Sequence, residues 1–300
     1  GLWWIKSRVS DGNTNQHQLG TSLTNNNEFI TTPASPLSMI ERAYISPAGN
    51  SVAWCWNAPD TWASTDADVT AGTIASSGQR NLAAGFSIVS YTGNGTLNAT
   101  VAHGLTQAPD LVFYKIRTST NGWCVYSFRT PNNYMQLNNS GSESSASVTF
   151  NNTAPTDSVL HIGSSVLTNG NTSDYLAYCW HSVPGFSKIG DYRGNGSTDG
   201  NYIYTDFKPQ FLLLKSTSTS QNWVWYDIKG HENNPVDRYA YANLTDSENS
   251  STTTEVDFYA NGFKFRSSHN MLNQSGIYFL YMAFAENPFG GENTAPATAR

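Results

Sequence analysis

The chain repeats parts of its own sequence, and this repetition constrains the fold more than any other feature. Residues 85–95 have the sequence GFSIVSYTGNG, and 185–196 return it as GFSKIGDYRGNG. Residues 109–126 match 209–226 without a gap, beginning with PDLVFYK in one copy and PQFLLLK in the other. A self-match at a fixed period indicates duplicated structural units. Such a chain is more typical of a scaffold or a binding protein than of an enzyme with one centre.

An incomplete third copy lies at the beginning of the chain. Residues 53–56, with the sequence AWCW, resemble 177–180, with the sequence AYCW. No Gly-Phe-Ser segment precedes this copy, so we expect the chain to be a fragment of a longer protein. The alternative is that another part of the fold, or another subunit, supplies the missing opening strands. The predicted division is a partial first repeat, a second repeat, a third repeat and a tail, at 1–80, 81–184, 185–290 and 291–300.

Composition favours an all-β protein with polar loops. Apolar residues make up 38% of the chain, charged residues 13% and aromatic residues 13%, and much of the remainder is Asn, Ser, Thr and Gly. A disordered chain would lack the aromatic residues. The net charge of −6 argues against nucleic acid as a partner, because phosphate contacts need clustered Lys and Arg. No apolar run approaches the ~18 residues of a membrane span, so we expect no membrane insertion.

The apolar pattern is that of strands. Residues 111–114 and 211–214 are short apolar runs between polar residues, as is typical of strands buried on both faces. Gly-Asn-Gly at 93–95 and 194–196 marks turns. Each full copy therefore offers the strands of a sandwich of about 100 residues. We predict an all-β fold of tandem antiparallel β-sandwich-like repeats with long polar loops.

Residues that recur between the copies are predicted to form the core. Cys55 and Cys179 hold the same repeat position, and Ala285 replaces them in the last copy, which indicates a small buried residue rather than a disulfide partner. Lys115 and Lys215 end the apolar runs, and we expect their ammonium groups to reach solvent. The predicted structural repeat core is Phe86, Phe186, Trp123, Trp223, Tyr126, Tyr226, Cys55, Cys179 and Ala285.

The sequence predicts no catalytic residue, no metal site and no cofactor. The histidines lack the paired spacing of zinc ligands, and His103 before Gly104 is typical of a turn at a strand end. Glycoside hydrolysis needs two carboxyl groups about 5 to 10 Å apart. Acidic residues of the last copy have no assignable counterpart in the second copy, and their spatial distance is open at this stage: Asp227, Glu232, Asp237 and Asp257.

Aromatic residues outside the repeated core are the stronger indication of a ligand. A sugar ring presents an apolar face and a rim of hydroxyl groups, which suits an aromatic side chain beside amide and charged groups. Loops on a rigid scaffold are also where binding specificity usually lies. The alternative is that these residues anchor loops by packing on the sandwich. The candidates are Trp62, Tyr134, His231, Arg238, Tyr239 and Tyr241.

Several motifs resemble a family of uncharacterised bacteriophage virion proteins of marine and cyanophage type, which are tail-fibre-like. The resemblance is carried by GFSIVSYTGNG at 85–95, VAHGL at 101–105, WCVY at 123–126, YMAFAENPF at 281–289 and PATAR at 296–300. It covers most of the chain from about residue 81, although no His-Gly-Leu follows the second Gly-Phe-Ser copy. It implies a carboxy-terminal repeat module of a virion structural protein, and it offers no catalytic residue to carry over.

Together these observations predict a tail-fibre or receptor-binding module on the virion surface. It would adhere noncovalently to a host surface glycan or protein, as a homo-oligomer in contact with other virion proteins, and linked weak sites would gain avidity. One alternative is a capsid-decorating or tail structural subunit without a host ligand. A second is a glycan depolymerase, and an extracellular bacterial adhesin also remains open.

Overall fold

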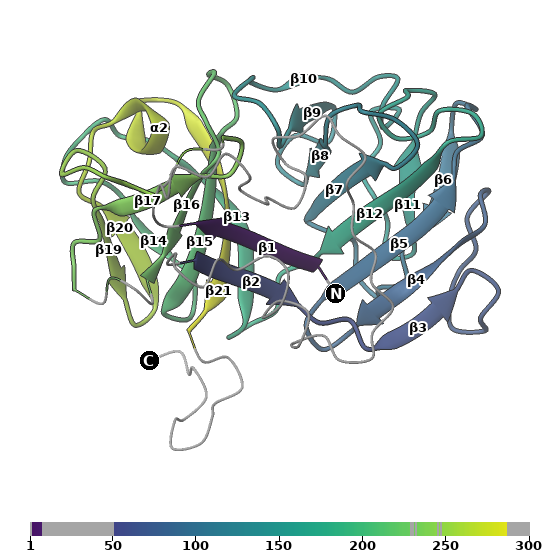
Figure 1. Cartoon of the computed structure of the whole chain (residues 1–300), viewed down its shortest axis with the longest axis horizontal. Helices are drawn as coiled ribbons and strands as arrows, with labels where there is room; N and C mark the ends of the chain where they lie inside the picture. Colours follow the sequence, from purple (N-terminus) through teal and green to yellow (C-terminus); the bar gives the residue numbers. More distant parts are fainter. Residues whose placement is uncertain are drawn as a thin grey trace.

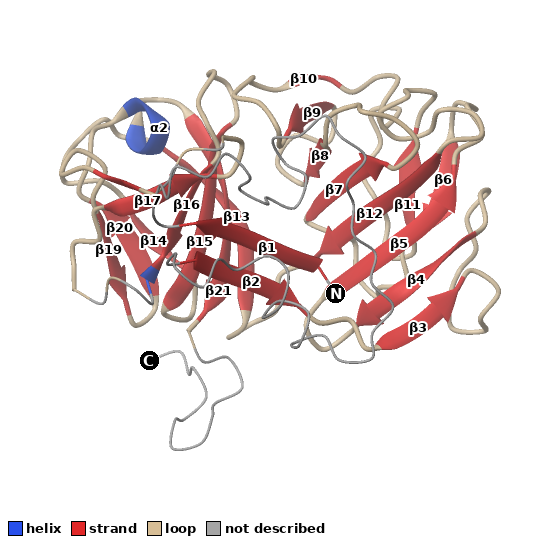
Figure 2. Cartoon of the chain, viewed as in Figure 1, coloured by secondary structure: helices blue, strands red, loops and turns tan. Residues whose placement is uncertain are grey.

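Antiparallel strands are the main regular secondary structure of the described chain, and turns and polar loops join them (Figure 2). The structure is a computed structural model that describes residues 2–7, 51–228, 231, 233–244, 246 and 248–286. Residues 8–50 of the predicted first repeat and the predicted tail at 291–300 lie outside the described residues. The prediction of an all-β fold of antiparallel, sandwich-like repeats is confirmed.

The second repeat has two layers of strands with an apolar core between them. Its large sheet contains, in spatial order, β10 (Ser144–Ser145), β9 (Asn133–Gln136), β8 (Cys124–Ser127), β7 (Leu111–Ile116), β12 (Asp174–Trp180), β5 (Phe86–Thr92), β4 (Ser76–Asn81) and β3 (Asp60–Ala63). The opposite layer is formed by β6 (Ala99–Ala102) and β11 (Val159–Ile162). The sequence placed β3 and β4 in the first repeat, but β4 hydrogen-bonds to β5 and therefore extends the sheet of the second.

The third repeat has the same two-layer arrangement. Its large sheet contains, in spatial order, β13 (Ser187–Arg193), β21 (Tyr278–Ala285), β15 (Pro209–Ser216), β16 (Val224–Asp227), β17 (Arg238–Tyr241) and β18 (Asn249–Ser250). Its small sheet contains β14 (Tyr202–Tyr204), β20 (Gly262–Phe265) and β19 (Val256–Tyr259). A short α-helix, α2 (Asn270–Asn273), precedes the last strand, and His269 caps its first turn.

The central strands of both large sheets are buried on both faces. In β7, Val112 and Tyr114 point toward the small sheet, whereas Leu111 and Phe113 point to the opposite side. Side chains of a strand alternate between its two faces, so a continuous apolar run needs an apolar partner on each face. This explains why these runs lack the alternation of a strand with one solvated face.

The two large sheets pack against each other through one apolar layer, the central core. It combines buried side chains of the second and third repeats, including Phe113 with Trp223, whose ring centroids lie 6.3 Å apart. The first repeat contributes as well: β1 (Leu2–Ser7) pairs with β2 (Ser51–Trp56), and this ribbon lies between the other two repeats (Figure 1). The Trp56 ring lies 5.9 Å from that of Trp180 and 5.4 Å from that of Phe284. The repeats therefore share a core and are not independent beads.

Strand pairing aligns the three copies and corrects one predicted equivalence. Cys55 and Cys179 do occupy the same ladder position, opposite the second residue of β1 and of β7. In the third repeat the corresponding residue, opposite Leu212, is Ala283 and not Ala285. The alignment by the Ala-aromatic motif was displaced by two residues, a shift that leaves every side chain on the same face. The conclusion that a small buried residue is needed is unchanged, because Cys179 and Ala283 are both fully buried.

Most other predicted core residues are buried. Phe86 and the recurring tryptophans, Trp123 and Trp223, lie in the central core, and Tyr126 and Tyr226 lie in the cores of their own sandwiches. Phe186 is half-buried and packs against the central core. The side chain of Cys55 lies outside the described part of the structure. These placements follow from the strand pattern, because aromatic residues fit a pleated, buried surface.

The recurring lysines do not reach solvent, contrary to the prediction. Lys115 Nζ donates to the carbonyl oxygen of Asn121 at 2.6 Å, and Lys215 Nζ donates to those of Gln221 at 2.7 Å and Ser140 at 3.1 Å. Both side chains are buried, and burial lowers the pKa of Lys215 to about 8. Packing between the sheets blocks the path by which each lysine side chain was expected to reach solvent. Each ammonium group therefore donates hydrogen bonds to backbone carbonyls instead. The contact with Ser140 also joins the third repeat to the second.

A buried asparagine stabilises the Gly-Asn-Gly turn in both full repeats. Asn169 accepts from the backbone N–H of Asn94 at 2.8 Å, and its backbone carbonyl accepts from Gly95 N at 2.9 Å. Asn273 makes the corresponding bonds to Asn195 at 2.9 Å and Gly196 at 2.8 Å. Both asparagines are fully buried, so these bonds replace water for groups that would otherwise be unsatisfied. Gly95 and Gly196 have φ values of +68° and +70°, which other residues rarely adopt.

Because the core is shared, the two full repeats should unfold together. Trp180→Ala removes a ring that contacts Trp56, Phe86 and Phe113, and we expect it to cost about 3–5 kcal/mol of the free energy of unfolding. Urea unfolding followed by tryptophan fluorescence and by circular dichroism should give one coincident transition for this variant and for the parent chain. The exposed substitution Leu97→Ala serves as the control and should change stability little. Two separate transitions would contradict the shared core.

Candidate functional site

Two of the predicted ligand-binding residues belong to the packing of the second repeat. Trp62 lies on β3 and is buried, with its ring so close to Gly104 that a Cβ atom there would lie 2.5 Å from it. Tyr134 lies on β9 and packs against the same sandwich core. The prediction required aromatic residues in loops. Both residues instead lie on strands and pack against core side chains. Trp62 cannot present its ring to a ligand in this conformation.

The other four candidates come together in the third repeat. His231 Nε2 and Arg238 Nη1 lie 3.5 Å and 3.8 Å from the same Glu248 carboxylate oxygen. Tyr239 and Tyr241, on β17, are in edge contact with ring centroids 5.4 Å apart. Tyr239 is buried, and the half-buried Tyr241 directs its hydroxyl to Met271 Sδ at 3.8 Å. These tyrosines anchor the loop region on the sandwich, which is the alternative that the sequence left open.

The acidic residues considered for hydrolysis have different environments. Asp227 is buried at the end of β16, whereas Asp257 on β19 accepts from Arg266 Nε at 2.5 Å. Glu232 lies outside the described residues. Among the residues that the structure describes, no group of three or more His, Cys, Asp and Glu side chains is arranged to hold a metal ion. No helix in the same part of the chain has the length and apolar character of a membrane span.

A different surface presents aromatic and charged side chains to solvent: the outer face of the small sheet of the third repeat. On β14, Tyr202 and Tyr204 are 44% and 49% exposed, while Ile203 between them points into the core. We call this surface the tyrosine–charge face and define it by outward side chains of the three strands and of the adjacent loop and turn. Its residues are Asp199, Tyr202, Tyr204, Asp257, Tyr259, Lys264 and Arg266.

The ladder fixes the order of these side chains. Tyr202 lies opposite Lys264 on β20, and Lys264 lies opposite Asp257 on β19. Side chains directly opposite each other in neighbouring strands are in contact distance. Gly262 separates Tyr204 from Tyr259 in the next row, and a Cβ atom there would come within 2.7 Å of the Tyr202 hydroxyl oxygen. The glycine therefore leaves room for the Tyr202 side chain to lie across the sheet.

Hydrogen bonds hold the exposed tyrosines in place. The Tyr202 hydroxyl donates to Asn261 Oδ1, and its ring is in edge contact with that of Tyr259 at 5.7 Å. The Tyr204 hydroxyl donates to Asp206 Oδ1 at 2.6 Å. Their rings are thus ordered but remain open to solvent, so a ligand would lose little conformational entropy by stacking on them.

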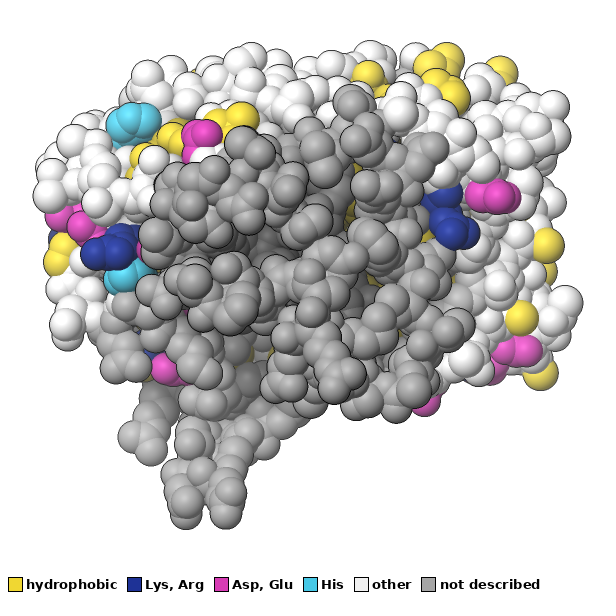
Figure 3. Space-filling model, viewed as in Figure 1, with side chains coloured by type: hydrophobic (Ala, Val, Ile, Leu, Met, Phe, Trp, Pro, Cys, Tyr) yellow, Lys and Arg dark blue, Asp and Glu magenta, His cyan; other side chains and the backbone are white. Residues whose placement is uncertain are grey.

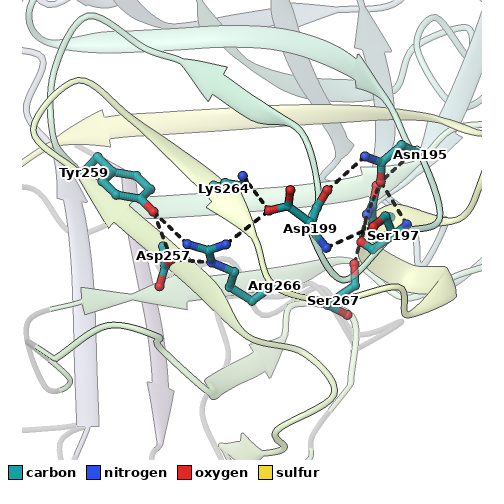
Figure 4. Close-up of polar contacts among 9 residues, drawn as sticks. Asn195, Ser197, Asp199, Asp257, Tyr259, Lys264, Arg266 and Ser267 are labelled. Carbon is teal, nitrogen blue, oxygen red and sulfur yellow. Dashed lines mark hydrogen bonds and ion pairs between the residues drawn. The ribbon is translucent and has the colours of Figure 1, made fainter.

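A chain of ion pairs crosses the face beside the tyrosines (Figure 4). Arg266 contacts Asp257 through Nε at 2.5 Å and the Tyr259 hydroxyl through Nη2 at 3.2 Å. On its other side Asp199 Oδ1 accepts from Lys264 Nζ at 2.7 Å and from Arg266 Nη1 at 3.3 Å. The hydrogen bond from Lys264 lowers the pKa of Asp199, and the hydrogen bond to Asp257 raises the pKa of Arg266. Asp199 and Arg266 are therefore both charged near neutral pH.

Of the two full repeats that the structure describes, only the third has this face. The small sheet of the second repeat directs Thr100, Val159 and His161 outward at comparable places, and no aromatic side chain of its two described strands faces solvent. The apolar core and the buried asparagines that hold the Gly-Asn-Gly turns occur in both full repeats, whereas this surface occurs in one of them. A feature added to one copy of a duplicated scaffold is not required by the scaffold, which makes it a candidate for function.

Charged side chains are scarce elsewhere on the visible surface. In Figure 3 most of the described surface is uncharged, and Lys, Arg, Asp and Glu side chains occur in small groups near its two ends. The tyrosine–charge face was not predicted from the sequence, because binding residues were expected in the long polar loops. The available signal was the alternation in Tyr202-Ile203-Tyr204 and in Phe263-Lys264-Phe265-Arg266, which places polar and aromatic residues on the outside of strands.

The fold and this face define a protein of duplicated β-sandwiches that carries one specialised surface. Comparison with protein families finds a match to a domain of unknown function, DUF7483, over residues 4–288. The match covers nearly the whole chain, and the protein therefore belongs to this family. No curated protein and no solved structure matches the chain.

His103 is a structural residue at the end of β6, in agreement with the sequence interpretation. Its Nδ1 accepts from the backbone N–H of Leu105 at 3.2 Å, and its Nε2 lies 3.2 Å from the Thr156 carbonyl oxygen. This pattern requires the neutral ring with its proton on Nε2. The ring is fully buried, and desolvation lowers the pKa of His103 to about 4.

His103 should make the fold sensitive to acid. Its pKa is near 6.5 in the unfolded chain and about 4 in the folded one, so the unfolded state binds the extra proton between these values. Stability from this group is complete above pH 6.5 and falls by up to ~3 kcal/mol as the pH drops to 4. We expect His103→Asn to reduce the slope of melting temperature against pH in this window. His161→Asn, at a more exposed ring, should reduce it less, and equal slopes in all three proteins would contradict the assignment.

Proposed function

We propose that this protein is a structural protein of a phage virion, a tail-fibre or receptor-binding module that adheres noncovalently to a host surface glycan. The observation that carries the proposal is the tyrosine–charge face, with two half-exposed tyrosines beside fixed Asp, Lys and Arg groups. Exposed aromatic surface with a polar rim is typical of a binding site. The virion location rests on the sequence resemblance to phage proteins.

The arrangement suits a carbohydrate in particular. Tyr202 and Tyr204 offer apolar ring surface for the face of a sugar, and the neighbouring charged groups and Asn261 offer donors and acceptors for hydroxyl groups. Polar groups fixed by the scaffold discriminate between ligands, because a wrong partner leaves them unpaired. A single shallow site of this kind binds weakly. Homo-oligomerisation on a particle would raise the avidity by a factor of about 10²–10⁴.

A structural subunit without a host ligand is the second candidate, and one observation favours it. Leu97, Val148 and Val166 of the second repeat are 55%, 52% and 47% exposed. Val148 and Val166 lie on adjoining turns, since Ser165 N donates to the Val148 carbonyl oxygen at 2.9 Å. Exposed apolar side chains on adjoining turns are typical of protein interfaces, so this area could contact other virion proteins.

A glycan depolymerase has less support. Its general acid needs a carboxyl group with a raised pKa beside a second carboxylate. On the tyrosine–charge face the pKa of Asp199 is lowered, and Asp257 is held by Arg266. Both carboxylates are arranged as ion-pair partners of cations, which is the opposite of what a proton donor requires.

Removing the exposed rings should abolish adhesion without unfolding the protein. We expect Tyr202→Ala and Tyr204→Ala each to weaken binding by about tenfold, equal to ~1.4 kcal/mol of binding free energy. Binding of the purified chain to an array of bacterial surface polysaccharides measures the effect, and chromatography of the bound polymer detects cleavage. Tyr278→Ala, which removes a tyrosine 37% exposed outside the face, is the control and should leave binding unchanged. Binding that ignores the first two substitutions would contradict this site, and shortened polymer would favour the depolymerase.

A further inference from the structure

Asp199 has an unusual place among the charged groups of the tyrosine–charge face. Its side chain is 76% exposed, yet one of its carboxylate oxygens lies between Lys264 Nζ and Arg266 Nη1 (Figure 4). It comes from the loop between β13 and β14, whereas both cations come from β20 and the residue that follows it. The loop thus inserts an anion into a cationic pair that belongs to the sheet.

The position of the Arg266 guanidinium does not depend on Asp199. Asp257, whose side chain is 11% exposed, accepts from Arg266 Nε, and the Tyr259 hydroxyl contacts Nη2. These contacts leave the Nη1 end of the guanidinium directed at Asp199. Lys264 is fixed between Tyr202 and Asp257 in the ladder. The sheet therefore holds Arg266 Nη1 toward this point before any anion arrives, and the ladder places Lys264 beside it.

Asp199 itself is bound weakly enough to be replaced. Exposed ion pairs contribute little net free energy because water and salt compete for both partners. The loop has its own bonds, with Asp199 N donating to Ser197 Oγ at 3.1 Å and Asn195 Nδ2 donating to the Asp199 carbonyl at 3.2 Å. The backbone can thus remain in place while the carboxylate turns away into solvent.

We propose that Lys264 and Arg266 bind an anionic group of the ligand, a carboxylate or a sulfate of an acidic polysaccharide, in the place that the Asp199 carboxylate now occupies. This proposal rests on the proposed function and specifies its ligand class. A guanidinium and an ammonium group converging on one point suit a carboxylate or sulfate oxygen. Tyr202 lies opposite Lys264, so the sugar ring that carries the acid would lie on the Tyr202 ring. Asp199 competes with the ligand, and its removal should strengthen binding.

The test compares three polymers and three substitutions in the full chain. Dextran, dextran sulfate and polygalacturonate supply a neutral, a sulfated and a carboxylated polymer, and their dissociation constants are measured at low and at high salt. Asp199→Asn removes the competitor, and Lys264→Gln removes one cation. Asp68→Asn is the matched control, because Asp68 is also an exposed carboxylate in an ion pair, with Arg80, but lies outside the face. Melting temperatures verify that each variant is folded.

The expected result is tighter binding of at least one acidic polymer than of dextran by the parent chain. Asp199→Asn should tighten that binding by about threefold to fivefold, as expected for loss of one competing exposed ion pair. Lys264→Gln should remove the preference for the acidic polymer, and high salt should weaken it. Preference for dextran sulfate alone or for polygalacturonate alone identifies the anionic group.

Two outcomes would overturn the inference, and they differ from a failure of the proposed function. If Asp199→Asn and Asp68→Asn strengthen binding equally, the effect is one of general charge and not of competition. If dextran binds as tightly as the acidic polymers and Tyr202→Ala weakens it, the face binds glycans but has no anion site. The proposed function itself fails if none of the three polymers binds and if the two tyrosine variants bind every glycan of the array as the parent chain does.

Discussion

The apolar layer between the two large sheets is the contact on which the rest of the structure depends. Each large sheet already packs against a small sheet on its other side, so its central strands are surrounded by apolar groups on both faces. Such strands cannot be stable in an isolated repeat, because one face would expose rows of aromatic and aliphatic side chains to water. Trp56 brings the first repeat into the same layer, where it contacts side chains of both others. Burial also explains the lysines near the edge of this layer, which can be accommodated only by donating to backbone carbonyls.

The two full copies are alike at the positions that the shared core requires, and they differ at positions that it does not require. The buried asparagines, the Gly-Asn-Gly turns and the backbone N–H groups of the recurring tryptophans make the same hydrogen bonds in both full copies. A fully buried polar group has few alternatives once its partners are in place, so these positions resist change. The outer face of a small sheet has no such constraint, and there the copies differ: Thr100 and His161 in one, the tyrosine–charge face in the other. One specialised surface on a duplicated scaffold is the feature on which the proposed binding function rests.

The sequence supported the fold better than the site. Apolar runs, turn glycines and a fixed period specify strands and their approximate grouping, because these signals are local. Two of the binding candidates are buried for a tertiary reason: Trp62 and Tyr239 lie in polar stretches, yet neighbouring strands cover their rings. Tyr202 and Tyr204 lie within a strand and not in a long polar loop, yet they are 44% and 49% exposed, with Lys188 Nζ 5.4 Å from the centroid of the Tyr204 ring. The sequence also did not determine the strand register of the third repeat. By motif, Ala285 matches the position of Cys179 as well as Ala283 does, although the two alanines are two residues apart.

By itself the sequence determined that the chain is built from repeated β-sandwich units, because side-chain periodicity and positive-φ turns depend only on neighbours along the chain. It also determined which residues must be small or aromatic at the repeated positions. Tertiary structure alone decided which of the two faces of each strand meets water, since that depends on which sheet packs against which. It therefore decided that the copies share one core, that β3 and β4 extend the second repeat, and that Lys264 and Arg266 converge beside exposed tyrosines. Convergence of residues distant in sequence is a property of packing, and no local pattern encodes it.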